Sequence, residues 1–428
     1  SIPLDVDGCS EDGVEGDEQF KPSFSCSTCK SRIPSNLVQE WYADDAQAGG
    51  RLDALAHWFW KLVRKGPLLG YHAKLTKCFL VVKPHRLEEA ERIFAGSGVQ
   101  IVAGGKRDLG AAIGCEAFIE RFLKEKVAGW TGMVERLAVI ASSQPHAAHA
   151  ALTHGLSGKW KFSQRTMPEL REYLQPLEDA IRLKFLPKLF GKEQLPITDD
   201  FRSLLALPAR NAGMGLFNPV EEAPHAHADS VEFTAQMVSR IMDSSVQLDL
   251  DREELKKAKK AIRQRRIARN DGMAAALGMR AEPKLRRAMA LAQEKGASAV
   301  ISARPLERYG FAFKCKRDYT DLMRMRYRMR LEFLPEVCAC GAKYSLDHSQ
   351  ICQKGGFIHM RHDDCAKMFA GVTKEVFNDV GYEPPLIPLS GEQMRLKSAN
   401  IQDGARSDVR VRGFWGQRRN AFFDFTVF

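Results

Sequence analysis

The chain has 428 residues, of which 44% are hydrophobic, and its 64 Lys and Arg residues outnumber its 53 Asp and Glu residues to give a formal charge of +11. This composition excludes a globally disordered protein, and the length allows about two or three domains with cores of their own. The longest dense apolar stretch, residues 78–82, is too short to cross a bilayer, so we predict no membrane partner.

The cysteine content and the first residues point to a reducing compartment, either nuclear or cytoplasmic. Ten cysteines are present, some of them close to histidines, which favours a metal site over a secreted disulfide scaffold. The first residues lack the basic and apolar regions of a secretory signal, and residue 1 is Ser, which indicates a processed chain or a fragment.

Residues 1–36 are acidic and rich in Ser, Gly and Pro, which predicts a disordered tail. Apolar periodicity and turn residues predict the elements that follow. They are a helix over 51–65, a strand over 78–82, a helix over 87–94, strands over 99–103 and 108–113 with a tight turn at 104–105 between them, and helices over 116–141, 144–156 and 168–186, the last kinked at Pro176. Next come a turn-rich connector over 207–219, charged helices over 225–330, a Cys-, His- and Gly-rich segment after Pro335, and strands over 409–414 and 421–428. The pattern predicts a helix-rich α+β multidomain protein with a boundary near residue 330.

Positive charge is concentrated in two stretches. Residues 251–270 contain nine Lys or Arg and three acids, and residues 323–330 alternate Met or Tyr with Arg. Such stripes are typical of proteins that bind polyanions, and a solvated helix face is the alternative. The predicted nucleic-acid-binding residues are Lys256, Lys257, Lys259, Lys260, Arg263, Arg265, Arg266, Arg324, Arg326, Arg328 and Arg330.

Two adjacent carboxylates, Asp44 and Asp45, follow Tyr42 and Ala43 at the end of a predicted strand. Because side chains alternate along a strand, neighbouring acids reach one metal ion together only where the backbone turns tightly. Template-dependent polymerases use such a turn to hold the Mg²⁺ ions that activate the 3′-hydroxyl. Asp44 and Asp45 are therefore candidate catalytic Mg²⁺ ligands, and a solvated turn is the alternative.

Cysteine and histidine gather in a CxC-x₇-H-x₃-C pattern made of Cys338, Cys340, His348 and Cys352. Three thiolates and an imidazole suit Zn²⁺ in a closed tetrahedral site, which is structural and not catalytic. A set of small buried core thiols is the alternative. The spacing therefore predicts a zinc knuckle over residues 335–360.

Asp408 and Asp424 border the two strands predicted near the end of the chain. Each lies eight residues from Gly416, so an antiparallel pairing around that glycine places the two acids opposite one another. Paired carboxylates of this kind hold the Mg²⁺ or Mn²⁺ of metal-dependent nucleases, and Glu375 in the preceding helix is a weaker third ligand. An alternative to the paired acids is a nuclease metal site formed by His359, His362 and Asp363.

The tetrapeptide Tyr42-Ala43-Asp44-Asp45 resembles the catalytic box of reverse transcriptases, and the motifs after it keep that family's order. Residues 70–78 resemble the glycine-to-lysine segment of the palm, residues 109–114 resemble the hairpin that grips the primer, and the helices over 116–200 resemble a thumb. This likeness makes Lys77 the candidate that protonates the pyrophosphate leaving group.

A zinc cluster, an Arg-His-Asp segment and paired strand acids after a reverse transcriptase resemble the order of non-LTR retrotransposon polyproteins, which end in a restriction-enzyme-like endonuclease. In the PD-(D/E)xK pattern of such nucleases, Asp408 matches the first acid and Asp424 the second. The resemblance implies a partial palm over 37–114, a thumb over 115–205, a basic helical linker over 206–334, the zinc knuckle over 335–360 and a nuclease domain over 361–428.

The implied activity of the parent protein is target-primed reverse transcription, with an RNA template, a DNA primer or target, and deoxynucleotides. This chain alone is expected to lack polymerase activity. In the family, a further metal-binding Asp and the fingers precede the Asp-Asp box, and the residues that precede the box here are too few to supply them. Thr426 stands where the pattern has Lys, so we expect metal binding without efficient cutting. The alternative function is a non-catalytic nucleic-acid-binding remnant with a structural zinc site.

Overall fold

The computed structural model of the protein describes residues 22–25, 32–34, 37–42, 45–192, 195–242, 252–303, 305, 313, 315–355, 357–386 and 406–426. The chain divides into two compact units, Ser1–Arg330 and Leu331–Phe428. Helices dominate and the sheets are small, so the helix-rich α+β class expected from the sequence is confirmed. Within the described residues, no helix combines the length and apolar character that crossing a bilayer requires.

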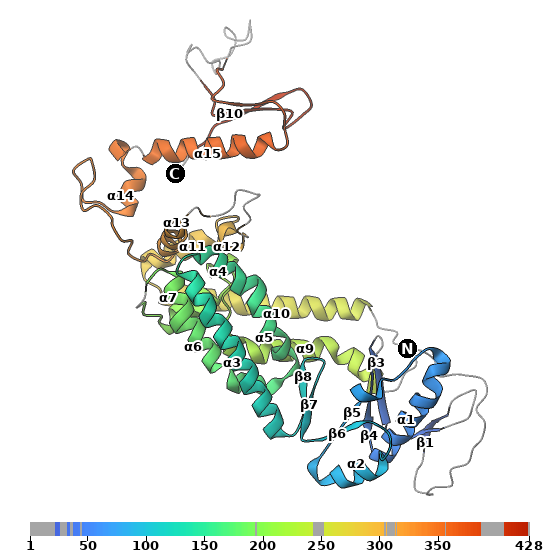
Figure 1. Ribbon diagram of the computed structural model, residues 1–428. Helices are drawn as coiled ribbons and strands as arrows, with labels where there is room; N and C mark the ends of the chain where they lie inside the picture. The colour runs from blue at the N-terminus through green and yellow to red at the C-terminus, as the bar shows by residue number, and fades with distance from the viewer. Residues whose placement is uncertain are drawn as a thin grey trace. The chain divides into compact units, whose positions relative to one another are not determined.

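The first unit begins with small strands (Figure 1). Strands β1 (Pro22–Ser25) and β2 (Arg32–Pro34) pair antiparallel, and the rest of the predicted disordered tail lies outside the described residues. Strands β3 (Leu37–Tyr42) and β4 (Asp45–Gly50) form an antiparallel hairpin in which Tyr42 pairs with Asp45. Asp45 of the Asp-Asp box is therefore the first residue of β4, and Asp44 lies outside the described residues.

A βαβ unit follows the hairpin and the helix α1 (Leu52–Lys65). Strands β5 (Phe79–Val82) and β6 (Gln100–Ala103) pair in parallel and are joined by α2 (Leu87–Ile93). Phe59 of α1 and Phe94 bury their rings at 6.1 Å between centroids and close the small core of this region.

The antiparallel hairpin that follows differs from the prediction. The expected turn at 104–105 only leads from β6 into β7 (Gly105–Asp108), and the true hairpin pairs β7 with β8 (Ala111–Gly114). Its turn is Leu109-Gly110, and both residues have positive φ, 43° and 90°. The sequence did not reveal that β6 pairs with β5 rather than with the strand after it.

A helical body forms the rest of the first unit. Its first part contains α3 (Glu116–Ala141), α4 (Pro145–Ala150), the π-helical η4 (Ala151–Leu156), α5 (Ser157–Thr166), the 3₁₀ segment η5 (Pro168–Tyr173), α6 (Gln175–Asp179), the π-helical η6 (Ala180–Phe185), α7 (Leu186–Leu189) and α8 (Asp199–Ala206). The predicted kink at Pro176 is instead a break, because α6 begins at Gln175 and its first turn accommodates a residue without an N–H. The central helix α3 buries Leu123, Val127, Trp130 and Val134 at helical spacing.

Five further helices follow the connector among the described residues of the unit. They are α9 (Pro219–Met242), α10 (Arg252–Arg280), α11 (Pro283–Gln293), α12 (Ala299–Ser302) and α13 (Lys316–Arg326), and the connector contains the 3₁₀ turn η7 (Ala209–Asn211). Helices α9 and α10 lie side by side (Figure 1). Ala274 and Leu277 of α10 and Tyr319 and Met323 of α13 enter the same apolar core as α3.

The second unit is a small α/β layer. It contains α14 (Leu346–Ile351), the 3₁₀ turn η9 (Gln353–Gly355), α15 (Phe357–Lys374) and an antiparallel sheet in the order β11 (Asn420–Phe423), β10 (Val409–Arg412), β9 (Val380–Tyr382). Ala366 and Ala370 of α15 pack on Val409 and Val411 of the sheet. The small residues let the helix approach the strands closely.

A buried ion pair fixes the middle of the first unit. Arg202 of α8 donates to both oxygens of Glu178 of α6 at 2.6 and 2.8 Å, and to the carbonyl of Leu216 at 2.8 Å. The side chains are only 3% and 5% exposed. Burial raises the pKa of the Glu178 carboxyl, and the hydrogen bonds from Arg202 oppose that rise. The pair therefore joins α6, α8 and the connector that leads to α9.

Replacing Arg202 with Met is expected to lower the free energy of unfolding of the first unit by about 3 to 5 kcal/mol, because Glu178 is left buried without its partner. The double variant R202M/E178L removes the stranded charge and should recover most of that loss. Urea unfolding of the full chain measures both values. A loss below about 1 kcal/mol for R202M would contradict the role given to this pair.

Candidate functional site

The four predicted zinc ligands converge on one point in the second unit. The Sγ atoms of Cys338 and Cys352 lie 3.6 Å apart, Cys340 Sγ lies 3.2 Å from His348 Nε2, and all four ligand atoms lie within 4.8 Å of one another. Two Zn–S bonds of about 2.3 Å at a tetrahedral angle separate the sulfurs by about 3.8 Å. The donor set and its spacing therefore fit Zn²⁺, and the alternative of scattered core thiols does not describe this convergence.

Local backbone structure positions each ligand. A tight turn between Cys338 and Ala342 presents the first two thiols, and Gly341 occupies the left-handed conformation there with a φ of 87°. The Ser345 hydroxyl accepts a hydrogen bond from the His348 amide and starts α14, which carries the imidazole. Cys352 ends the same helix and is buried. A turn, a helix start and a helix end thus supply all four ligands within fifteen residues.

The basic residues of α10 divide into two faces. Five exposed cations lie within about 100° of the helix circumference, and we name them the α10 basic face. They are Arg252, Lys256, Lys259, Lys260 and Arg263. Lys256 forms an exposed ion pair with Glu253, and no other member has an ion pair among the described residues. Lys257 is exposed about a quarter of a turn from Lys256.

The other face of α10 does not match the prediction for Arg265. Arg265 pairs with Glu232 at 2.5 Å and with Asp229 at 3.3 Å, and Arg266 lies 3.6 Å from Asp229. Arg269 extends the series with Glu222 at 2.9 Å. Arg265 and Arg269 join α10 to α9, so Arg265 is assigned a structural role. Arg266 lies seven residues after Lys259, beside the basic face, with 54% of its side chain exposed, and remains a predicted nucleic-acid-binding residue.

The alternating Met and Arg run also needs correction. Arg324 is buried and donates to the carbonyls of Phe190 and Gly191 at 3.0 and 3.1 Å. Arg326 donates to Ser298 Oγ at 2.8 Å inside the same body. Because α13 packs its Tyr and Met side chains into the core, both arginines are held inside the first unit, where they hydrogen-bond to its other elements. Arg328 and Arg330 are exposed.

Asp45 and Lys77 are the described members of the predicted polymerase site. Asp45 is exposed at the start of β4, whereas Asp44 lies outside the described residues. Lys77 is exposed in the 3₁₀ turn η2 (Leu75–Lys77), directly before β5. Gln47 of the β3–β4 hairpin donates to Asp108 at 3.0 Å, which ties it to the β7–β8 hairpin. The hydrogen bond therefore joins β4, which begins with Asp45, to β7, which directly precedes residues 109–114.

The terminal acids lie just beyond the β10–β11 ladder. Val409 pairs with Phe423 and Arg412 with Asn420, and Asp408 and Asp424 each lie one residue beyond the Val409–Phe423 pair. Asp408 Oδ2 accepts hydrogen bonds from the Phe425 amide at 2.6 Å and from His362 Nε2 at 3.1 Å. Asp424 is exposed.

His362 is the residue of this region that the paired-acid prediction did not use. Its hydrogen bond with Asp363 and the negative charge of Asp408 raise its pKa and favour the imidazolium. His359 is exposed, and no Cys, His or acid cluster besides the zinc ligands converges on one point among the described residues. The set of His359, His362 and Asp363 therefore does not form a metal site here.

Glu375 is also corrected. It is exposed after the end of α15, thirteen residues beyond His362, and a helical rise over that length is about 20 Å. Because His362 contacts Asp408, Glu375 lies far from the two strand acids and cannot serve as their third ligand.

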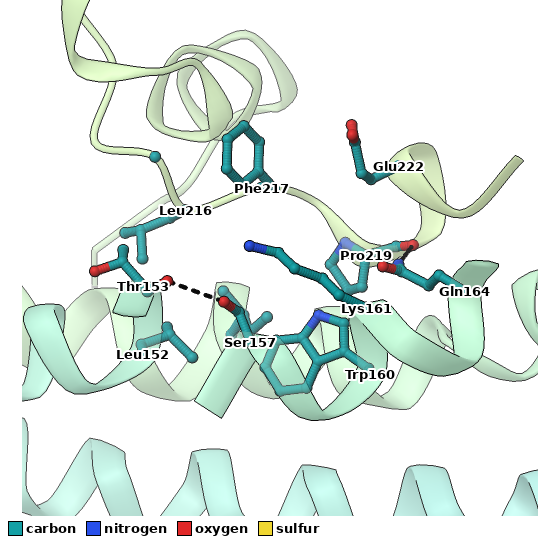
Figure 2. Close-up of a pocket in the computed structure, with 12 residues that line it drawn as sticks. Leu152, Thr153, Ser157, Trp160, Lys161, Gln164, Leu216, Phe217, Pro219 and Glu222 are labelled. Atoms are coloured by element: carbon teal, nitrogen blue, oxygen red, sulfur yellow. Dashed lines mark hydrogen bonds between the residues drawn. The ribbon is translucent and has the colours of Figure 1, made fainter. Parts of the chain in front are cut away.

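Figure 2 shows a pocket of the first unit that is too small for a cofactor. Trp160, Phe217 and Glu222 surround Lys161, whose ammonium lies 5.5 Å from the centre of the Phe217 ring. Burial lowers the pKa of Lys161. The space of about 20 Å³ accommodates a single water. This pocket is part of the packing between α5 and α9.

No protein-family model, curated protein or solved structure matches this chain. Its function is therefore inferred from the charges, ligands and register of the described residues.

The zinc site predicts one Zn²⁺ per chain, and Cys352→Ser should abolish its binding and unfold residues 335–360, because the metal and the local fold are coupled. Metal analysis and hydrogen exchange measure the two effects. Cys365→Ser is the matched control, since this half-buried thiol of α15 is outside the cluster. Purified protein without stoichiometric zinc would contradict the assignment.

Proposed function

We propose that this chain binds nucleic acid through the α10 basic face. The observation that carries the proposal is the exposure of the α10 basic face: acids of α9 pair with Arg265 and Arg269 on the side of α10 that faces α9, whereas the members of the basic face keep their cations exposed. The face extends over twelve residues, about 17 Å along the helix. Cations at such spacing meet several phosphates of one strand and displace their counterions.

We further propose that the chain is part of a non-LTR retrotransposon polyprotein, in which a reverse transcriptase palm and thumb precede a zinc knuckle and a restriction-enzyme-like endonuclease. Support comes from Asp45 at the hairpin connection, Lys77 before β5 and the link between Gln47 and Asp108. In this proposal the partners are an RNA template and a DNA primer or target. Asp44 and Asp45 would hold Mg²⁺ or Mn²⁺, which activates the primer hydroxyl toward a deoxynucleotide.

A divalent-metal site at Asp408 and Asp424 is the second candidate. The register of β10 and β11 favours it, since opposed residues at the end of an antiparallel ladder lie on the same side of the sheet. A bound Mg²⁺ or Mn²⁺ supplies activated water for phosphodiester hydrolysis. Because Thr426 stands at the Lys position of the nuclease pattern, we propose metal binding without efficient cutting. The non-catalytic alternative shares the α10 basic face and the zinc site, and lacks this metal.

The binding proposal is tested with two triple variants of α10 that change the charge equally. K256Q/K259Q/K260Q should lower the slope of log affinity against log salt by about 3 for an RNA–DNA hybrid duplex, since each phosphate contact contributes about 0.9. R265Q/R269Q/R280Q removes three arginines that are paired with acids of other helices, so it should leave that slope unchanged and lower the melting temperature instead. Fluorescence anisotropy from low to high salt measures the slopes. Equal slopes for wild type and the first variant would mean that the face only contacts solvent.

The metal proposal predicts that zinc-loaded protein binds one further Mn²⁺, measured by electron paramagnetic resonance. Asp408→Asn and Asp424→Asn should each weaken that binding strongly, because each removes a charged oxygen ligand. Glu375→Gln should retain it and is the control from the far end of α15. Retained Mn²⁺ binding in both Asp variants, or none in wild type, would favour the non-catalytic alternative.

A further inference from the structure

The loop between β10 and β11 exposes an aromatic side chain among free cations. Trp415 is 78% exposed, whereas the core tryptophans Trp130 and Trp160 are 5% and 4% exposed. Arg418 and Arg419 follow it and are also exposed. Neither arginine has an ion pair among the described residues, and residues 413–419 contain no acid. An exposed indole beside two exposed arginines offers a ligand an aromatic face and two positive charges.

The loop is held rigidly by its own backbone. The Gly413 amide donates to the Arg419 carbonyl at 2.7 Å, and the Arg419 amide donates to the Gly416 carbonyl at 3.1 Å. Gly413 and Arg418 adopt positive φ, 93° and 64°, which closes the turn. The arginines and the indole are therefore presented from a fixed turn at the end of a paired hairpin.

A row of aromatic rings anchors the indole. Trp415 meets the Phe414 ring edge-on at 4.7 Å between centroids, and Phe414 lies 4.9 Å from Phe423 and 5.6 Å from Phe377. These phenylalanines pack against the apolar core of the second unit. Since Phe414 already completes the core, the exposed indole adds little to it. A fixed ring loses little conformational freedom when a ligand stacks on it.

The charge around the loop selects the ligand. The neighbouring acid Asp379 is already engaged by Arg410 and lies 3.8 Å from Arg412, so it does not neutralise the loop. Arginines beside a free aromatic ring suit phosphates and an unstacked base, which is how proteins without sequence preference hold single strands. A base inside a duplex cannot offer its face to the indole.

We propose that the β10–β11 loop binds single-stranded nucleic acid, with a base stacked on Trp415 and flanking phosphates on Arg418 and Arg419. The loop begins five residues beyond Asp408, about 17 Å along β10, so a strand held there would run toward the paired acids. The proposal deepens the proposed function and rests on it only in that the chain binds nucleic acid. It does not need the α10 basic face.

The test uses the full chain carrying K256Q/K259Q/K260Q, so that the α10 basic face no longer dominates the signal. Trp415→Ala should weaken binding of a labelled oligothymidine by about 5- to 150-fold, the range for losing one stacked base. It should leave binding of an abasic strand of equal length unchanged. Trp415→Phe should recover most of the affinity, and R418Q/R419Q should lower the salt slope by about 1.4.

Met368→Ala is the matched control, because Met368 is 67% exposed on α15 of the same unit and has no basic loop beside it. Oligothymidine binding by Trp415→Ala within twofold of its parent, or an equal loss for the abasic strand, overturns the inference; the loop would then be a contact for a protein partner. Wild-type protein that binds no nucleic acid at all overturns the proposed function as well, so the two failures are distinguishable.

Discussion

The contact between Arg202 and Glu178 is the constraint on which the first unit depends. The guanidinium holds α6 and α8 together and, through the Leu216 carbonyl, fixes the connector that sets the direction of α9. The Gln164 side chain of α5 also donates a hydrogen bond of 2.8 Å to the Pro219 carbonyl, at the end of that connector. A buried ion pair is weak as a source of stability, but losing one partner is costly, which makes the arrangement specific.

The direction of α9 in turn decides what α10 presents to its surroundings. Acids of α9 form ion pairs with the arginines on the side of α10 that faces α9. The α10 basic face lies on the exposed side of the helix. Surface pairs of this kind contribute little stability individually, yet they fix which cations are free. The second unit shows the same arrangement on a smaller scale. Asp379 pairs with Arg410 of the sheet, whereas Arg418 and Arg419 are exposed on the loop. In both units, acids on neighbouring elements form ion pairs with some of the basic residues, and the remaining basic residues stay exposed.

Short-range patterns in the sequence predicted many of the helices and strands and the zinc ligands. Helices such as α1 and α3 follow from apolar spacing, the zinc ligands follow from their interval, and the antiparallel pairing of β10 with β11 follows from symmetry about Gly416. What the sequence did not reveal depends on partners distant along the chain. Arg324 finds its acceptors more than 130 residues away, and Arg265 finds Glu232 on another helix. The parallel pairing of β5 and β6 was missed for the same reason.

The central claim is that the α10 basic face contacts nucleic acid, and lysine footprinting tests it most directly. Acetylation of the folded full chain is measured by mass spectrometry with and without a saturating RNA–DNA hybrid. The account predicts that the hybrid slows acetylation of Lys256, Lys259 and Lys260, and leaves the rate at Lys184, which is paired with Glu135 on the helical body, unchanged. Equal acetylation rates at the three lysines with and without the hybrid would contradict it.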